Sequence, residues 1–192
     1  QPYSYFQLME VSLRELLVEK GVLTEAQIAD AVADMRGRSP ERGAKVVARA
    51  WVDASFKKRL LEDGSRACEE LGLDVPALKL VVVENTPAVH NMVVCTLCSC
   101  YPRMLLGTPP DWYKSRNYRS RAVREPRAVL SEFGLRLDLQ TKIRVHDSTA
   151  DMRYLVLPMR PGGTAGWNEE RLASVVTRNC MIGVAVPQKN GA

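Results

Sequence analysis

The densest group of reactive side chains is a run of cysteines near the middle of the chain. Cys95, Cys98 and Cys100 lie in the stretch VVCTLCSCYPR, residues 93–103, and they are three of the five cysteines among 192 residues. Thiols this close together bind a metal or take part in redox chemistry more often than they form a disulfide framework. The C-x-x-C-x-C segment from residue 95 to residue 100, called the cysteine loop below, is therefore the first candidate for a functional site.

The side chains alone leave several kinds of site open. A structural zinc site usually has four ligands in two separated pairs, and His90 and His146 lack the spacing of a ligand pair. An iron–sulfur cluster would need a fourth thiolate, from Cys68 or Cys180. A redox pair of two cysteines would leave the third one of the loop unexplained.

The backbone of the cysteine loop offers two further donors. The sulfurs of Cys98 and Cys100 and the amide nitrogens of Ser99 and Cys100 can occupy the corners of a square around one metal. The Cys95 sulfur then lies above the square, and the opposite position stays open for water or substrate. Amide nitrogens bind a metal strongly only when deprotonated, which requires a strong Lewis acid such as trivalent cobalt or iron, and thiolates favour such late transition metals. This geometry is possible, but it does not exclude a three-cysteine zinc site.

Two regions of different periodicity surround the cysteine loop. Residues 1–77 are predicted to be helical, with a capping box at Thr24 and Gln27 and Pro40 in a first helical turn, and we expect an arm that embraces a partner. Residues 78–192 mix strands and helices and are predicted to form an α+β catalytic domain that binds the metal. The predicted strands are residues 78–85, 92–97, 142–147, 153–158 and 180–187, and the predicted helices of this region are residues 109–123, 124–134 and 168–179.

The overall composition is that of a globular protein, with 46% hydrophobic and 26% charged residues. No apolar run approaches the roughly 20 residues of a membrane helix, and no signal peptide is recognised, so we expect a cytoplasmic protein without a membrane partner. The net charge is +5, and residues 114–127 hold six basic residues against one acid. Because no stacking aromatic residues accompany this charge at the spacing of a known module, we expect a surface or subunit interface there and no nucleic acid.

Three longer stretches resemble one family. VCTLCSCYP, PPDWYKSRNYRSRAVREPRAVLSEFG and IRVHDSTADMRYLVLPMRPGGTAGWNEERLASVVTRNCMIGVAVP closely resemble the alpha subunit of nitrile hydratase, over about residues 80–187. The resemblance implies a layered α-β-β-α domain with an N-terminal helical arm. It also implies a low-spin trivalent metal held by Cys95 as axial thiolate, Cys98 as sulfinate, Cys100 as sulfenate, and the amide nitrogens of Ser99 and Cys100. Cobalt members carry threonine after the first cysteine and iron members serine, so Thr96 implies Co(III) rather than Fe(III).

The activity that the resemblance implies is the hydration of a nitrile to an amide. The metal acts as a Lewis acid on the nitrile or activates water, and Cys100 and Ser99 are the candidate catalytic residues, with the Cys100 sulfenate oxygen as nucleophile or base. Family members work with beta-type subunits, which supply arginines to the oxidised sulfurs, and with an activator protein that inserts the metal. The expected partners are therefore these proteins and a small-molecule nitrile.

One residue departs from the family pattern at the edge of the cysteine loop. Nitrile hydratases usually carry a tryptophan three residues after the last cysteine of the loop, and Arg103 stands there in this chain. An arginine at this place resembles the related gamma subunit of thiocyanate hydrolase, which implies binding of an anion or of a bulky polar or nucleoside-like nitrile such as toyocamycin. The alternatives are hydrolysis of thiocyanate to carbonyl sulfide and ammonia, and a metal-binding module without catalysis.

Other polar residues are assigned supporting roles. Arg153 is matched by an arginine in the family and is expected to support the site, and Asp147 and Asp151 are candidates to anchor arginines around the cysteine loop. The remaining cysteines are expected to be buried and inert, and both histidines to be ordinary hydrogen-bonded side chains.

Overall fold

The computed structural model describes residues 3–75 and 78–189, and the chain divides into two compact units, residues 1–37 and residues 38–192. The predicted boundary after residue 77 differs from this division and adjoins residues 76–77, which lie outside the described residues. The difference has a physical reason. The helices between residues 40 and 69 bury Val46, Val47, Phe56 and Leu60 in the same core as the strands, so they belong to the larger unit.

The smaller unit is a pair of helices without a core of its own. Helix α1 spans Tyr5–Glu19 and helix α2 spans Glu25–Gly37, and neither has a buried residue. The predicted capping box is confirmed, because the Gln27 side chain accepts a hydrogen bond from the Thr24 amide and the Thr24 hydroxyl accepts one from the Gln27 amide. The helices of this unit are thus specified locally, and their apolar side chains face outward.

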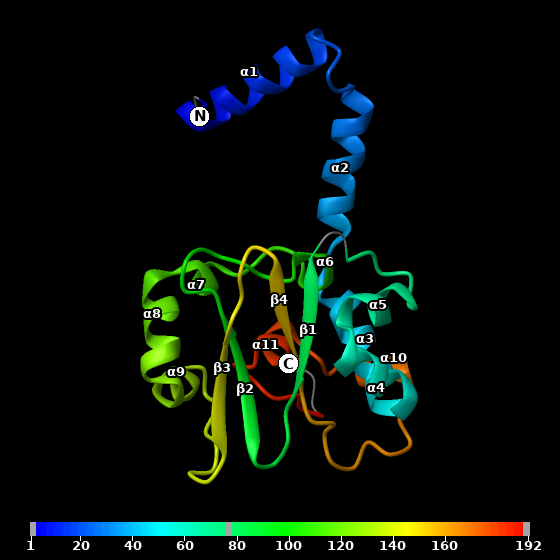
Figure 1. The fold of residues 1–192 in the computed structure, drawn as a ribbon, viewed down its shortest axis with the longest axis vertical. Coiled ribbons are helices and arrows are strands. Elements are labelled where there is room, and N and C mark those ends of the chain that lie inside the picture. Colours follow the sequence, from blue (N-terminus) through cyan, green and yellow to red (C-terminus); the bar gives the residue numbers. More distant parts are fainter. Residues whose placement is uncertain (1–2, 76–77, 190–192) are drawn as a thin grey trace. The chain divides into compact units, whose positions relative to one another are not determined.

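The larger unit contains two parallel two-stranded sheets (Figure 1). Strand β1 (Lys79–Glu84) pairs with β4 (Met152–Leu157), and β2 (Val89–Val94) pairs with β3 (Lys142–Asp147). The four strands predicted within residues 78–158 are therefore confirmed. Parallel pairing requires a long crossover, and the crossovers here contain the cysteine loop and the helices that follow it.

Helices cover the two sheets from opposite sides, as Figure 1 shows. Helices α4 and α5 contact β1, α9 contacts β3, and the two sheets contact each other through β1, β2 and β4. The order helix–sheet–sheet–helix confirms the layered α-β-β-α class. The helices of this unit are α3 (Pro40–Val52), α4 (Ala54–Glu62), α5 (Gly64–Glu69), α6 (Arg103–Leu106), α7 (Asp111–Lys114), α8 (Arg116–Arg124), α9 (Pro126–Glu132), α10 (Glu169–Ala173) and α11 (Arg178–Ile182).

The strand predicted at residues 180–187 is wrong, because this apolar stretch begins in helix α11. The Thr177 side chain caps the helix by accepting a hydrogen bond from the Cys180 amide, and Gly183 ends it in the left-handed conformation with φ 88°. Both signals are present in the sequence, but the run of apolar residues between them has no helical periodicity. Cys180 is buried in this helix rather than in a strand.

Candidate metal centre

The structure gathers the three sulfurs of the cysteine loop directly after β2. The Sγ atoms of Cys95, Cys98 and Cys100 all lie within 4.8 Å of one another, with Cys98 3.4 Å from Cys95 and 3.2 Å from Cys100. Cys95 is buried, Cys98 exposed and Cys100 half-buried. The loop is therefore anchored at its first cysteine and open to solvent at the second.

Backbone amides of the same loop point at the sulfurs. The Cys98 amide donates to the Cys95 Sγ at 3.3 Å. The amides of Ser99 and Cys100 lie close enough to the Cys98 sulfur to lower the pKa of its thiol. Sulfur and nitrogen donors thus converge in one small volume, as required for a metal held by two amide nitrogens and three thiolates. The donor set therefore fits a late transition metal that prefers thiolate ligands.

The environment of the loop shifts the pKa values of Cys98 and Cys100 in opposite directions. Thiol donors from Cys100 and Cys95, with the loop amides, hold the pKa of Cys98 below its usual value. Burial, followed by the hydrogen bond to Cys98, raises the pKa of Cys100, and the charge of Arg153 opposes that rise. Of these two thiols, Cys98 is therefore the more acidic, and it is also the more exposed to solvent.

Residues from three other elements hold the backbone of the loop. Asp147, at the end of β3, accepts hydrogen bonds from the amide and the hydroxyl of Thr96, and Arg119 of α8 donates to the Thr96 carbonyl at 3.4 Å. Tyr113 of α7 donates from its hydroxyl to the Cys100 carbonyl at 2.8 Å. Asp147 thus anchors a threonine of the loop rather than an arginine, and Asp151 accepts a hydrogen bond only through its backbone carbonyl within the described residues.

A cleft of about 400 Å³ opens beside the cysteine loop. Its lining includes Arg38, Arg103 and Arg153, and none of its described lining residues is acidic. Arg103 is exposed, and its side chain forms no hydrogen bond or ion pair with the described residues. Sequence analysis identified Arg103 and Arg153 but missed Arg38, which is distant in sequence from the loop and has no motif around it. The lining is completed by Leu78, Cys98, Ser99, Cys100, Tyr101 and Met104.

Both histidines lie in one hydrogen-bonded chain, in which His90 is buried and His146 is part-buried. His146 donates from Nε2 to Asn91, whose side-chain amide donates to Asn85, and the Asn85 amide in turn donates to Nδ1 of His90. His90 then donates from Nε2 to the Gly183 carbonyl at 2.7 Å. Every ring nitrogen used here has a partner of the right kind, so these are ordinary structural histidines, as predicted.

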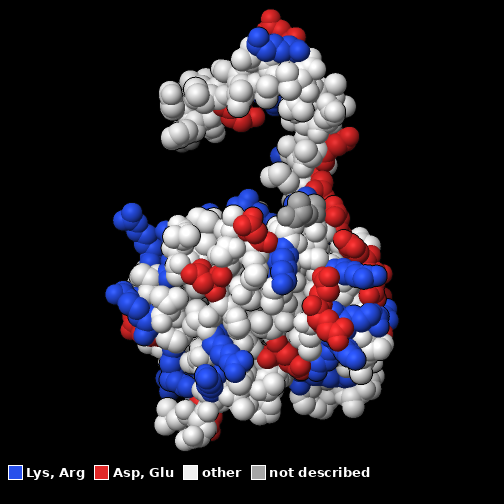
Figure 2. Space-filling model, in the orientation of Figure 1, with Lys and Arg blue, Asp and Glu red and all other residues white. Residues whose placement is uncertain are grey.

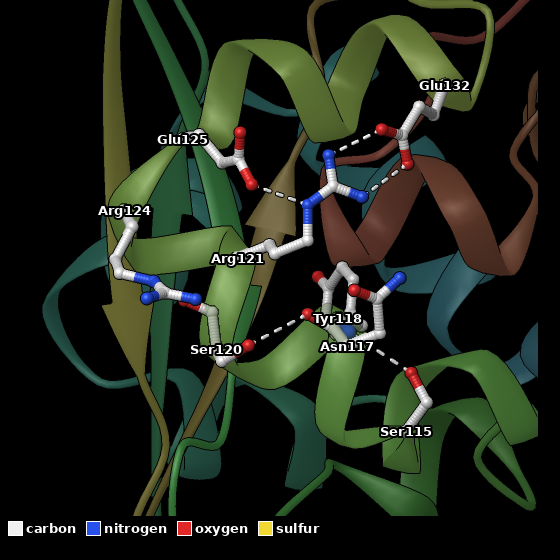
Figure 3. Close-up of polar contacts among 8 residues, drawn as sticks. All are labelled: Ser115, Asn117, Tyr118, Ser120, Arg121, Arg124, Glu125 and Glu132. Carbon is white, nitrogen blue, oxygen red and sulfur yellow. Dashed lines mark hydrogen bonds and ion pairs between the residues drawn. The ribbon is translucent and has the colours of Figure 1, made fainter.

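The basic segment at residues 114–127 uses much of its charge within the molecule. Arg121 of α8 bonds Glu125 and Glu132 and so ties α8 to α9 (Figure 3). Arg127 donates to the carbonyls of residues 137, 138 and 141. On the face of the larger unit seen in Figure 2, acidic and basic side chains are interspersed. In the described part of the chain, no helix is long and apolar enough to cross a membrane.

The family model and the known relatives that match this chain point to the same kind of protein. Residues 4–185 match the family model described as nitrile hydratase, alpha chain. The chain is 52% identical over 182 residues to the low-molecular weight cobalt-containing nitrile hydratase subunit alpha of Rhodococcus rhodochrous, covering 92% of this chain and 86% of the relative. It is 44% identical over 197 residues to the thiocyanate hydrolase subunit gamma of Thiobacillus thioparus, covering 96% and 81%.

Solved structures extend the same likeness to the fold. A recombinant thiocyanate hydrolase with partially modified cobalt centres superposes with a TM-score of 0.93 at 43% identity, covering 99% of this chain and 93% of that one. A double mutant of the Fe-type nitrile hydratase from Comamonas testosteroni superposes with a TM-score of 0.90 at 43% identity, covering 100% and 95%.

Proposed function

Because the chain belongs to the nitrile hydratase alpha-chain family, we propose that it forms the metal centre of a hetero-oligomeric enzyme that hydrates a nitrile to its amide. The observation that carries the proposal is the convergence of three thiols and the loop amides at the wall of a cleft. A cleft beside such a cluster would give a small substrate access to a metal bound there.

The metal that this proposal assigns is trivalent cobalt. Cys95, Cys98 and Cys100 would hold it through sulfur, and Ser99 and Cys100 through their amide nitrogens. When bound, the metal would supply Lewis acidity toward the nitrile or toward water. Thr96 supports cobalt over iron by the family pattern, and the Rhodococcus relative is a cobalt-containing enzyme by its name.

Oxidation of two of the thiols is the second part of the proposal. Cys98 as sulfinate and Cys100 as sulfenate would place oxygen atoms at the cleft, because both residues line it. Cys98 is exposed and has a lowered pKa, as expected of a reactive thiol, whereas Cys95 is buried and would stay unoxidised. Because Cys100 lines the cleft, its sulfenate oxygen would be available to accept a proton from water or to attack the nitrile carbon.

We propose that the positive charge that compensates the thiolates comes from both this chain and its partners. The charge of Arg153 opposes the burial that raises the pKa of the Cys100 thiol, so one cation of the site lies within this chain. Beta-type subunits would supply the remaining arginines, and an activator protein would insert the metal. The outward-facing apolar helices of residues 1–37 are the surface proposed to embrace such a subunit.

The substrate proposed is a bulky polar nitrile, nucleoside-like in character. Arg103 and Arg153 offer several N–H donors at one cleft, and the described lining has no carboxylate to neutralise them. A substrate that carries hydrogen-bond acceptors satisfies these donors, whereas a purely apolar nitrile leaves them without partners at a cost in affinity.

Thiocyanate hydrolysis is the second candidate, because the same arginines suit a small anion. The 44% identity to thiocyanate hydrolase subunit gamma supports it, together with the arginine in place of the family's tryptophan. Arg103→Trp separates the two functions. For a nitrile hydratase we expect this variant to keep nitrile turnover with a preference moved toward apolar nitriles, and neither form to release carbonyl sulfide.

The experiment that tests the function uses the chain co-expressed with its neighbouring subunit and activator genes in cobalt medium. Metal analysis should give stoichiometric cobalt, and tryptic peptide 80–103, which carries all three loop cysteines, should show the mass of one sulfinate and one sulfenate. Amide should form from a nitrile. Zinc with fully reduced thiols and no turnover would support a non-catalytic metal module instead.

A further inference from the structure

A cluster of buried aromatic side chains lies against the cysteine loop, and one of them reaches the loop backbone. Tyr113 is fully buried, and its hydroxyl donates to the Cys100 carbonyl at 2.8 Å. Its ring stands edge-on to Tyr101 at 5.1 Å between centroids and tilted against Tyr118 at 5.6 Å. Because it packs between two rings, the Tyr113 hydroxyl is held in one place.

Cys100 is the residue on which this hydrogen bond acts. Under the proposed function Cys100 supplies two ligands, its sulfur and its amide nitrogen, and both are attached through the same Cα as the carbonyl that Tyr113 holds. While the carbonyl is held, this Cα cannot turn without breaking a hydrogen bond and leaving a carbonyl beside apolar rings without a partner. The orientation of both ligands is thereby tied to a rigid part of the core.

We propose that Tyr113 is a positioning residue, which presets the sulfur and the amide nitrogen of Cys100 before the metal arrives. The inference rests on the proposed metal-binding function and adds a residue to it. Tyr113 is not a ligand and does not line the cleft, so its whole effect passes through Cys100. Loss of a group that orients a metal ligand typically lowers metal affinity about ten- to one-hundred-fold.

The aromatic cluster offers a matched control. Tyr118 is also buried, packs against Tyr113, and donates from its hydroxyl to a backbone carbonyl at 2.6 Å. Its acceptor is Val93, which belongs to strand β2 and is not a ligand residue. Tyr118→Phe therefore removes a bond of the same kind from the same cluster without releasing Cys100.

The test is an anaerobic titration of the reduced, metal-free full chain with Co²⁺, in competition with a coloured chelator. Tyr113→Phe should bind Co²⁺ about ten- to one-hundred-fold more weakly than the wild type. The Co²⁺ affinity of Tyr118→Phe should stay within about two-fold of the wild-type value. The thermal midpoints of the two metal-free variants should fall by similar amounts, because each loses one buried hydrogen bond. Equal affinity losses in the two variants, or none in Tyr113→Phe, would overturn the proposal.

A second measurement needs no metal and separates this inference from the proposed function. Amide hydrogen exchange of the loop segment in the metal-free chain should be faster in Tyr113→Phe than in either the wild type or Tyr118→Phe. Unchanged exchange in Tyr113→Phe shows that the loop is not held by this hydroxyl and rejects the inference. A wild-type chain that binds no Co²⁺ but shows the expected exchange contradicts the metal assignment and leaves Tyr113 as the residue that orders the loop.

Discussion

Asp147 holds Thr96 through two hydrogen bonds, at 2.9 Å from the Thr96 amide and at 2.5 Å from its hydroxyl. Asp147 is the last residue of β3, where it pairs in register with Val94, the residue before Cys95. The parallel pairing of β2 with β3 therefore brings the carboxylate to the start of the cysteine loop. A charged acceptor with two donors is stronger than a neutral pair, so this contact fixes the loop where it leaves the sheet.

Removing this carboxylate should loosen the metal site more than the fold. We expect Asp147→Ala, in the co-expressed enzyme, to lower cobalt affinity about ten- to one-hundred-fold, as loss of a group that orients ligands does elsewhere. Asp147→Asn should lose less cobalt affinity, because the side-chain amide oxygen can still accept a hydrogen bond from the Thr96 backbone amide. Cobalt content at limiting cobalt and the sulfur-to-metal absorption band are the measurements.

Asp151 provides the control for that experiment. It lies nearby in the sequence, but its side chain is exposed and its backbone carbonyl is its only hydrogen-bonded group within the described residues. Asp151→Ala should leave cobalt content at the wild-type level. A loss of cobalt as large as that of Asp147→Ala would show that charge in this region, rather than the bonds to Thr96, governs metal uptake.

The contact between Asp147 and Thr96 also shows what the sequence could and could not predict. The thiol spacing and the valine-rich strands are local patterns, so the cysteine loop and the four strands were predictable. The partners of the loop depend on which strands pair, and no local pattern encodes that β3 lies beside β2. Arg38 lines the cleft for the same reason, through the packing of a distant segment.

Gly183 occupies a position that no other residue can take without a large cost. Its φ is 88°, and a Cβ there would collide with the backbone oxygen of Asn91. We expect Gly183→Ala to destabilise the chain by about 3 kcal/mol or more, because left-handed strain is added to a clash with backbone. Urea unfolding measures the loss.

Gly134 is the matched comparison, because it has a similar φ of 81° but open space where a Cβ would lie. Gly134→Ala should lower the free energy of unfolding by about 1–2 kcal/mol, which is the cost of the left-handed backbone conformation alone. If the two variants lose equal stability, the close approach between Gly183 and Asn91 contributes nothing.

His90 should make the fold less stable in mild acid. Burial holds its pKa below the usual value for histidine, although the bond to the Gly183 carbonyl opposes this. The unfolded chain therefore takes up a proton near pH 6.5 that the folded chain does not bind, so the free energy of unfolding falls as the pH drops from about 6.5 through the folded pKa. Above that range the full contribution is present.

The measurement is the free energy of unfolding between pH 5 and pH 8, for the wild type and for His90→Gln. The variant should be less stable throughout, because it loses bonds of the buried chain, but its curve should be flatter in this interval. His146, whose pKa is also lowered by burial, remains in both proteins and contributes equally to both curves. Parallel curves would show that His90 does not titrate differently on folding.

The apolar side chains of α1 should matter for assembly and not for the stability of the larger unit. Phe6 is 81% exposed and Leu13 is 57% exposed, and α1 buries no residue. Exposed apolar side chains on an unpartnered helix become favourable only when a partner covers them. We expect Phe6→Ser with Leu13→Ser to weaken association with the beta-type subunit at least about ten-fold, which corresponds to about 1.4 kcal/mol.

The control variant for the arm changes charge on the same helix while keeping its apolar face. Glu10→Gln with Arg14→Gln removes the exposed pair between these residues, which should affect association little. Co-purification and sedimentation with the beta-type subunit measure association, and the thermal midpoint of the isolated chain measures the fold. The apolar double variant should lose association with an unchanged midpoint; an association constant equal to that of the charge control would mean that this face of α1 does not contact the partner.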